Sequence, residues 1–412
     1  MKPAETKPRV LMIAYACDPE GSGEHWLGWG WAEQAANSYQ VDLITTPKAR
    51  VAVESSARAL GINPHFVEGP SSVRTMTEAM GGSWLRKLAW QKQVWRLAVE
   101  LHRQKPFQIV HQTTFHSFRV PFVAAGLKIP SVWGPIAGGE RVPHGFEPYL
   151  GRDRYSEAGR NWVNRLWLRS PSVRRSLKRS SVIFASNRVT KAFLPGQYHS
   201  KCQIVPPNAL HPEDEQATSP QTAGDRAVST FKLLYVGNCV ATRALPLVFE
   251  ALHQSGLTDY ELSIIGEGPA IPSWQSWVAR LGLTPKVKFI GKIPRAQLAS
   301  WYSAADVLVF PALRDSGGSA LLEAMARSLP VICLDWGGPA EMVDTNSGLK
   351  IPVVDPEATV TAFAGALAGL QRDPKKRAAL AAAGRNRALE FFRWQSKREL
   401  LEITYKRLLS RQ

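Results

Sequence analysis

The chain has 412 residues, of which 44% are hydrophobic and 21% are charged, and its formal net charge is +17. This composition excludes a disordered or fibrous protein, and the length predicts two domains rather than one. The positive charge favours an anionic partner, which leaves nucleic acid, an anionic membrane surface and phosphorylated small molecules as candidates.

Short apolar runs rich in Val and Ile alternate with longer helical patterns along the whole chain. Strands that are apolar throughout and separated by helices indicate parallel sheets covered on both faces. The predicted fold class is therefore α/β, with one parallel sheet in each half of the chain. Strands are expected at 10–15, 41–45, 107–110, 131–133 and 182–184, and again at 232–236, 262–265, 287–290, 307–310 and 331–334.

The division between the halves is expected at a segment without hydrophobic periodicity, 206–230, which is rich in Pro, Ser, Thr and charged residues. The run Glu213-Asp214-Glu215 inside it is interpreted as a solvated loop. The predicted organisation is an N-terminal domain over 1–208, a linker over 209–230, a C-terminal domain over 231–388 and a last helix over 389–412 that packs back toward the N-terminal domain.

Two loops that follow strands of the first half carry candidate site residues. The first contains Gly21, Gly23 and Glu24 ahead of a helix, but it lacks the third glycine of the dinucleotide fingerprint, which disfavours a hydride-transfer enzyme. The second begins at His111, directly after the strand 107–110, and includes His116. Each histidine is either a cleft residue or one that is solvated or hydrogen-bonded locally.

The positive charge is concentrated in residues 84–191, which hold 20 Lys and Arg against five Asp and Glu. Segments 83–105 and 161–180 interleave Trp and Leu with Lys and Arg, as do helices that lie on anionic lipid surfaces. The alternative is two ordinary basic helices whose tryptophans pack into the core. No nucleic-acid-binding motif accompanies the charge, so no nucleic acid partner is expected.

The cysteines and the apolar runs predict a cytoplasmic protein. The four cysteines are far apart and form neither a zinc cluster nor a disulfide framework. No run of 18 or more apolar residues occurs, and the N-terminal segment is interpreted as a first strand rather than a signal peptide. A strand ending near Trp133 leads into Glu140 and Arg141, which are expected to lie toward the same cleft as the two loops above.

The most informative stretch runs from Phe310 to Val343. A glycine-rich turn leads from a strand into a helix, an arrangement that presents backbone N–H groups and the positive end of the helix dipole to a phosphate or diphosphate. Asp315 and Glu323 flank this turn, and carboxylates accept hydrogen bonds from hydroxyl groups but repel phosphate. Sugar hydroxyls beside a diphosphate describe a nucleotide sugar.

The same stretch resembles the donor-site signature of retaining glycosyltransferases with the GT-B fold, family 4. The resemblance rests on Asp315, seven residues, Glu323-Ala-Met-Ala, Pro330-Val331 and Gly337-Gly338-x-x-Glu341. It implies GT-B architecture, with two Rossmann-like domains facing each other across a cleft and the acceptor bound by the N-terminal one. It further implies a donor of the UDP or GDP type, no permanently bound cofactor and no metal.

The resemblance also implies roles for individual residues. Glu323 corresponds to the residue that binds ribose hydroxyls, and Asp315, in place of the usual Glu, to the residue that holds the transferred sugar. Arg243 corresponds to a cation that neutralises the leaving diphosphate, and either His111 or His116 to a histidine that contacts the sugar. The remaining implied donor-binding positions are Gly21, Gly23, Gly237, Gly266, Glu267, Ile290, Ser316, Gly317, Gly318, Ser319 and Leu321.

The predicted function is therefore retaining transfer of a sugar from a nucleotide-diphosphate sugar to a hydroxyl of a glycan or lipid-linked acceptor, in polysaccharide or glycolipid biosynthesis. The expected location is the cytoplasm, including peripheral attachment to the inner face of the plasma membrane. The alternative is a catalytically weak GT-B protein that binds nucleotide sugars or assists assembly. Asn238, Ala244 and Asp315 motivate it, because the family has Arg, Gly and usually Glu at these positions.

Overall fold

The computed structural model describes residues 7–69, 83–217 and 230–411, and the chain divides into two compact units. The first unit comprises residues 1–139, 162–207 and 394–412, and the second comprises 140–161 and 208–393. Residues 140–161 thus belong to the second unit, although they were expected in the N-terminal domain. The expected linker lies partly outside the described residues, at 218–229.

The first unit is built on a seven-stranded parallel sheet in the order β3-β2-β1-β4-β5-β6-β7. The register aligns Val10 of β1 with Val41 of β2 on one side and with Ile109 of β4 on the other. Because all strands are parallel, their carboxyl ends lie along one edge of the sheet. The strands are β1 Arg9–Ala14, β2 Gln40–Thr45, β3 Asn63–Phe66, β4 Ile109–Gln112, β5 Ser131–Ile136, β6 Val182–Ala185 and β7 Cys202–Ile204.

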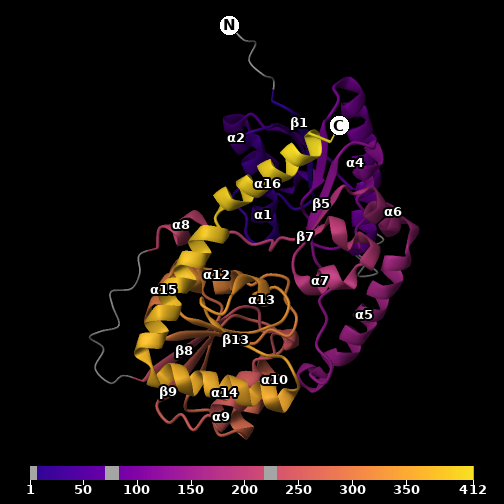
Figure 1. Ribbon diagram of the computed structural model, residues 1–412. Helices are drawn as coiled ribbons and strands as arrows, with labels where there is room; N and C mark the ends of the chain where they lie inside the picture. The colour runs from indigo at the N-terminus through magenta and orange to yellow at the C-terminus, as the bar shows by residue number, and fades with distance from the viewer. Residues whose placement is uncertain (1–6, 70–82, 218–229, 412) are drawn as a thin grey trace. The chain divides into compact units, whose positions relative to one another are not determined.

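Helices cover both faces of this sheet (Figure 1). On one face, Trp90 and Val94 of α4 and Leu177 of α6 pack against alternate residues of β1, β4 and β6. On the other face, Trp31 of α1 contacts Trp394 of α16, with ring centroids 6.0 Å apart. The helices are α1 Glu24–Ala36, α2 Arg50–Leu60, α4 Ser83–Gln104, α6 Pro171–Arg179, α7 Arg188–Phe193 and α16 Trp394–Leu409, with short 3₁₀ turns η1 Pro47–Ala49, η2 Val123–Leu127 and η4 Gly196–Lys201.

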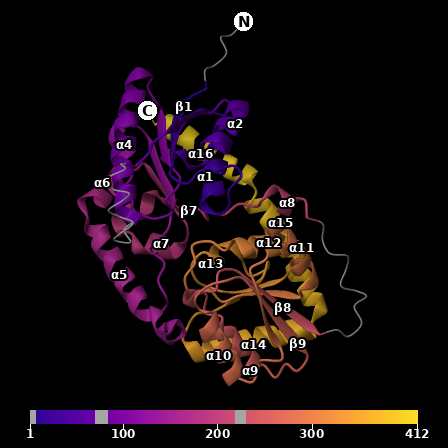
Figure 2. The same ribbon diagram turned by 180° about the vertical axis from the view of Figure 1, so that it is seen from behind.

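The second unit has a six-stranded parallel sheet in the order β10-β9-β8-β11-β12-β13. Helices α9, α10 and α14 cover one face and α11, α12 and α15 the other, and both sets are visible in Figure 2. The strands are β8 Phe231–Val236, β9 Tyr260–Ile265, β10 Val287–Gly291, β11 Val307–Phe310, β12 Val331–Leu334 and β13 Leu349–Ile351. The helices are α8 Pro212–Glu215, α9 Pro246–Gln254, α10 Ile271–Arg280, α11 Arg295–Ala304, α12 Ser319–Ala326, α13 Pro339–Met342, α14 Pro356–Arg372 and α15 Pro374–Phe391, with 3₁₀ turns η3 Glu147–Leu150 and η6 Ala241–Arg243.

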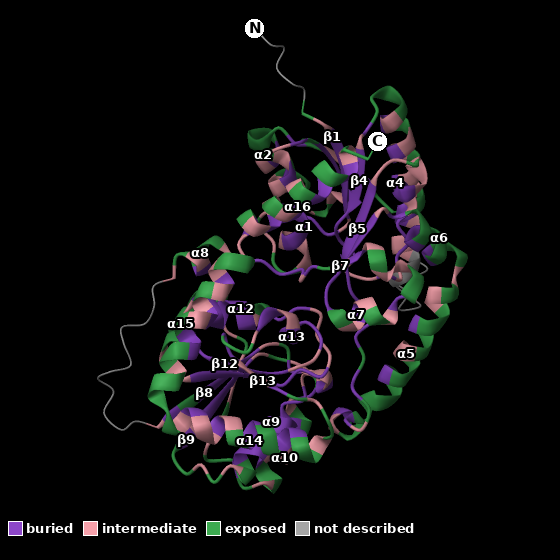
Figure 3. Ribbon diagram, viewed as in Figure 1, coloured by how far each residue is buried: buried purple, intermediate pink, exposed green. Residues whose placement is uncertain are grey.

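The predicted fold class is confirmed, since both units are parallel sheets covered by helices. The interior strands of both sheets are buried along most of their length, as Figure 3 shows, whereas the edge strands β3, β7, β10 and β13 are mostly half-buried or exposed. One helix, α5 (Asp153–Arg169), begins in the second unit and ends in the first. Throughout the described part of the chain, every helix is too short or too polar to cross a lipid bilayer.

Candidate functional site

The glycine-rich segment of the second unit forms the loop between β11 and α12. Gly318 has a φ of 120°, which residues with a side chain rarely adopt. No side chain caps the start of α12, so none competes with an anion at the positive end of this helix. A Cβ on Gly338 would lie 2.3 Å from the carbonyl carbon of Ser316, so the second glycine pair of the motif supports the loop directly.

Glu323 lies on α12, is 8% exposed and has both carboxylate oxygens hydrogen-bonded. Arg295 Nη1 donates to Oε1 at 2.7 Å, and the hydroxyl of Tyr302 donates to Oε2 at 2.8 Å. Burial raises the pKa of Tyr302 well above its ordinary value, and the charge of Glu323 raises it further. The carboxylate therefore has one fixed orientation, with its remaining lone pairs available to hydroxyl donors.

The acidic run at 213–215 is not a solvated loop, contrary to the interpretation from the sequence. It forms the short helix α8, and Asp214 is 1% exposed. Asp214 pairs with Arg295 at 2.8 Å and with Arg327 at 2.6 Å, while Glu213 pairs with Arg295 at 2.5 Å. A carboxylate loses too much hydration to be buried alone, so the two arginines account for its burial. Through Arg295, the segment after 208 is joined to Glu323.

Arg243 and Asp315 form an ion pair within the second unit. The loops that carry them are also joined by the backbone, because Leu313 N donates to Thr242 O at 3.0 Å. The second Asp315 oxygen accepts from Gly317 N at 3.1 Å. The cation and the carboxylate that the resemblance assigns to diphosphate and sugar thus lie side by side. Ala244 is fully buried with a φ of 45°.

Two further glycine loops of the predicted site lie against each other. A Cβ on Gly266 would lie 1.9 Å from Gly237 O, so no side chain fits there. Cys239 N donates to Glu267 O at 2.8 Å and joins the loop after β8 to the loop after β9. The predicted residues Gly237, Gly266 and Glu267 are therefore brought together at the carboxyl edge of the sheet.

Two other predicted donor-binding residues differ in accessibility. Ile290 is half-buried near the end of β10, where Gly266 N donates to Gly291 O at 2.9 Å. Leu321 is fully buried in the core, and its amide donates to Gly318 O at 3.0 Å. Its side chain therefore packs beneath the loop, and donor binding at Leu321 stays a prediction for its backbone.

Asn208, which no sequence motif singled out, contributes to the same loop. Its Nδ2 donates to Ser319 Oγ at 2.7 Å. A Cβ on Gly317 would lie 1.9 Å from the Asn208 Oδ1 atom, so the glycine is required by this contact. Ser319 is thereby oriented at the first position of α12.

Residues 140–161 pack onto the second unit beside this loop. Glu157 of α5 pairs with Arg314 at 3.1 Å and with Arg160 at 2.8 Å, and Arg314 directly precedes Asp315. Trp336 Nε1 donates to Arg141 O at 2.9 Å. The expectation that Glu140 and Arg141 belong to the acceptor-side domain is therefore corrected, because this segment forms part of the second unit.

In the first unit, the two predicted loops lie next to each other. Gly21 N donates to Asp18 O at 3.2 Å and closes the turn that leads to Gly23. Glu24, the first residue of α1, accepts from Phe115 N at 2.8 Å. This hydrogen bond brings the glycine loop next to the half-buried His116.

His111 lies within β4 rather than after it, and it is fully buried. Its Nε2 lies 2.7 Å from Gly134 O, which can only accept, so Nδ1 accepts from the Tyr405 hydroxyl at 2.7 Å. Burial lowers the pKa of His111 to about 4, against the opposite effect of the hydrogen bond to Gly134. Both ring nitrogens of the neutral His111 are thus engaged in hydrogen bonds inside the first unit. The expectation that His111 lies on a loop and contacts the sugar is therefore corrected.

Comparison with families of known proteins supports the resemblance in the second unit. The family model of "Glycosyl transferases group 1" matches residues 224–387. A GDP-mannose-dependent alpha-(1-6)-phosphatidylinositol monomannoside mannosyltransferase of Mycolicibacterium smegmatis is 31% identical over 169 residues, which cover 39% of this chain and 42% of that protein. A D-inositol 3-phosphate glycosyltransferase of Kineococcus radiotolerans is 30% identical over 234 residues, which cover 52% and 53%. The chain thus spans about half or less of the length of these curated relatives.

Solved structures match the fold over the whole chain. Sucrose-phosphate synthase from Thermosynechococcus elongatus has a TM-score of 0.66 at 18% identity and covers 98% of this chain and 100% of its own. HepE of Anabaena in complex with UDP has a TM-score of 0.63 at 15% identity, with coverages of 97% and 100%. At these identities the likeness concerns the fold, and the family match at 224–387 confirms the resemblance found in the sequence.

Proposed function

We propose that this chain, whose residues 224–387 match the glycosyl transferases group 1, transfers a sugar from a nucleotide-diphosphate sugar to a hydroxyl of a glycan or lipid-linked acceptor. The observation that carries the proposal is the arrangement around Glu323, whose carboxylate is fixed by Arg295 and Tyr302 beside the uncapped start of α12. Such a carboxylate suits ribose hydroxyls, and the helix start suits a diphosphate.

In the proposed reaction, the bond between the anomeric carbon and the diphosphate breaks, and a bond to the acceptor oxygen forms on the same face. The acceptor proton leaves with the diphosphate. Arg243 and the start of α12 stabilise the charge that develops on the leaving group, and Asp315 holds hydroxyls of the transferred sugar. These positive groups supply the stabilisation without a metal ion, so we expect chelation to leave the rate unchanged.

The donor is proposed to carry uracil or guanine. The M. smegmatis relative is named as GDP-mannose-dependent, and HepE was crystallised with UDP. Calorimetric titration with UDP and GDP separates the two, and turnover is then measured with the corresponding nucleotide sugars. We expect Glu323→Ala to abolish turnover, whereas Glu357→Ala, at an exposed position of the same unit, leaves it unchanged.

The second candidate function is nucleotide-sugar binding without efficient transfer. It is favoured by the positions next to Arg243, because Asn238 carries no charge and Ala244 is buried in a left-handed backbone conformation. Only one of the two cations of the family pattern is therefore present. Tight nucleotide binding without turnover on any donor of the panel would support this function and contradict the transferase.

We place the enzyme on the inner face of the plasma membrane, as a peripheral protein. The support is a basic patch of the first unit at 162–179, where Trp162 is 63% and Leu166 42% exposed among arginines. In contrast, Trp90 of the segment 83–105 is 1% exposed and packs into the core, as the alternative interpretation expected. Sedimentation with anionic liposomes tests this attachment. Binding should weaken when the exposed cations Arg174, Arg175, Lys178 and Arg179 are replaced by glutamine, and unchanged binding would contradict the attachment.

A further inference from the structure

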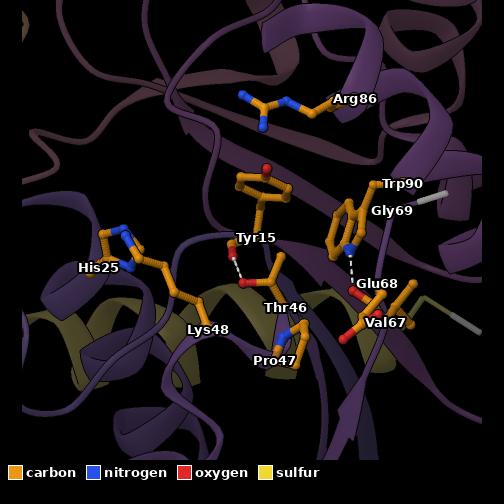
Figure 4. A pocket seen from close by; sticks show the side chains of 10 residues that line it. All are labelled: Tyr15, His25, Thr46, Pro47, Lys48, Val67, Glu68, Gly69, Arg86 and Trp90. Atoms are coloured by element: carbon orange, nitrogen blue, oxygen red, sulfur yellow. Dashed lines mark hydrogen bonds between the residues drawn. The ribbon is translucent and has the colours of Figure 1, made fainter. Parts of the chain in front are cut away.

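The first unit contains a pocket of about 650 Å³ at the carboxyl ends of β1, β2 and β3 (Figure 4). All of its lining residues belong to the first unit, and neither the family match nor the sequence motifs include this pocket. It is lined by residues from the ends of three strands, from α1 and from the first turns of α4, namely Tyr15, His25, Thr46, Pro47, Lys48, Val67, Glu68, Gly69, Arg86 and Trp90.

One side of the pocket is a fixed aromatic wall. Tyr15 meets Trp90 edge to face, with centroids 5.1 Å apart, and stacks on Phe115 at 4.6 Å. Trp90 Nε1 donates to Val67 O at 2.8 Å, and Thr46 Oγ1 donates to Tyr15 O at 3.1 Å. These bonds join the loops after the three strands to α4. The wall is therefore formed before any ligand arrives, which lowers the entropy cost of binding.

The charged groups of the pocket lack partners of their own. His25, Lys48 and Arg86 line it against the single carboxylate of Glu68, and none of these four side chains forms an ion pair or hydrogen bond with another described residue. The Arg86 Nε atom is buried without an acceptor among the residues that the structure describes. In Figure 4 its guanidinium points toward the hydroxyl of Tyr15. A buried donor without an acceptor is costly, and an anionic ligand would remove that cost.

We propose that this pocket binds a phosphorylated sugar or polyol through its phosphate group. A guanidinium binds phosphate oxygens in a bidentate manner, and from the other side Lys48 adds a positive charge and His25 a ring N–H donor. Glu68 and the Tyr15 hydroxyl accept hydrogen bonds from ring hydroxyls, while the ring lies along the aromatic wall. The volume suits a molecule of this size.

The ligand is the acceptor of sugar transfer, an assignment that rests on the proposed function. The donor diphosphate is assigned to the loop before α12 in the second unit, so the pocket is left for the other substrate. The same phosphate chemistry is offered by a soluble sugar phosphate and by the headgroup of a phosphoinositide-type lipid. The experiment separates these two sources.

The test is calorimetric titration of the full chain with glucose 6-phosphate, glycerol 3-phosphate and inorganic phosphate, with glucose as the uncharged comparison. We expect a phosphate ester to bind and glucose not to bind. Arg86→Gln should weaken binding at least about tenfold, as expected for the loss of a charge-assisted contact. Arg96→Gln, at an exposed position of the same helix, should leave it unchanged. Lys48→Gln tests the pocket independently if Arg86→Gln fails to fold.

Several results would overturn the proposal. The first is that none of the three phosphate compounds binds, and the second is that Arg86→Gln and Arg96→Gln bind phosphate esters with equal affinity. The third is that Arg243→Gln loses phosphate-ester binding, which would place the phosphate in the second unit. Vesicles of phosphatidylcholine with and without phosphatidylinositol identify the source. Binding to the phosphatidylinositol vesicles that depends on Arg86 assigns a lipid headgroup, and binding of soluble esters alone assigns a sugar phosphate.

Failure of the proposed function gives a different pattern. If phosphate esters bind in an Arg86-dependent manner but no nucleotide sugar is turned over, the pocket stands and the transferase does not. If Glu323→Ala abolishes transfer but Arg86→Gln binds phosphate esters like the unmodified chain, the transferase stands and the pocket does not.

Discussion

Replacing Tyr302 by phenylalanine removes one hydroxyl from a side chain that is 1% exposed. That hydroxyl donates to Glu323 Oε2 at 2.8 Å, whereas Oε1 keeps its bond from Arg295. A hydrogen bond to a charged group contributes about 1.5–3 kcal/mol, so we expect a loss of about 2 kcal/mol in the free energy of unfolding. For a domain of this size, that loss corresponds to a decrease of about 4–8 °C in Tm. The remaining Arg295 contact keeps the cost below the roughly 3–5 kcal/mol of a broken buried ion pair.

The assay for this prediction is urea-induced unfolding followed by circular dichroism. Tyr260→Phe is the matched control, because Tyr260 is buried in the same unit and its hydroxyl has no hydrogen bond to a described residue. A double-mutant cycle with Glu323→Gln isolates the coupling between the two side chains. We also expect Tyr302→Phe to weaken nucleotide binding, because the carboxylate loses its fixed orientation. If Tyr302→Phe costs no more than Tyr260→Phe, the hydroxyl does not hold Glu323.

Four further substitutions test the fold and the site. Burial alone would raise the pKa of Asp42, but hydrogen bonds from a histidine, an arginine and an asparagine hold it below its ordinary value. Its ionised form therefore stabilises the fold above about pH 5, and this stabilisation is lost as the pH falls through the ordinary carboxyl range. The unfolding free energy of Asp42→Asn should therefore vary less with pH in that range than that of the unmodified chain. Coincident pH profiles of the two proteins would contradict this. Gly30→Ala places a Cβ 1.9 Å from the Trp394 ring and should lower the unfolding free energy by about 1–3 kcal/mol. At Gly365 an added Cβ meets no atom within 4 Å, so Gly365→Ala should raise the unfolding free energy by about 0.5–1 kcal/mol. Gly338→Ala displaces the loop before α12 and should weaken UDP or GDP binding at least about tenfold in calorimetry, and unchanged affinity would separate the loop from the nucleotide.

The sequence alone predicted the interior strands of both sheets, but it missed three of the four edge strands. All ten strands expected from apolar runs are present. Nine of them are interior strands, which in a parallel sheet are buried on both faces and must be apolar, and the tenth, β10, lies at an edge. The three strands without a prediction, β3, β7 and β13, each lie at the end of a sheet. There one side is open, so short and partly polar strands are tolerated, such as β3 with its proline.

The loop before α12 could also be predicted from the sequence. Its residues lie within one stretch of the chain, and the backbone contacts explain the glycines locally, since Gly337 and Gly338 touch Asp315 and Ser316. Residues that act on the loop from distant segments gave no signal. Arg295 begins a helix of ordinary composition, and Asp214 lies in an acidic run that is usually solvated, so only the fold reveals that they meet.

The positively charged side chains of the chain have different surroundings in the two units. Around the donor loop, Arg243, Arg295 and Arg314 are each paired with a carboxylate, so a diphosphate must compete with Asp315 for Arg243. In the pocket of the first unit, Lys48 and Arg86 have no such partner among the described residues. An incoming anion displaces only water and counterions there, and the exposed Lys48 is screened by salt more than the buried ion pairs of the donor loop. We therefore expect phosphate-ester binding to weaken more steeply with ionic strength than nucleotide binding does. Calorimetry of both ligands between 50 and about 500 mM salt, over which the Debye length shortens severalfold, compares the two slopes. Equal slopes would mean that the cations of the pocket are as well compensated as those of the donor loop, and the distinction between the two anion sites would be lost.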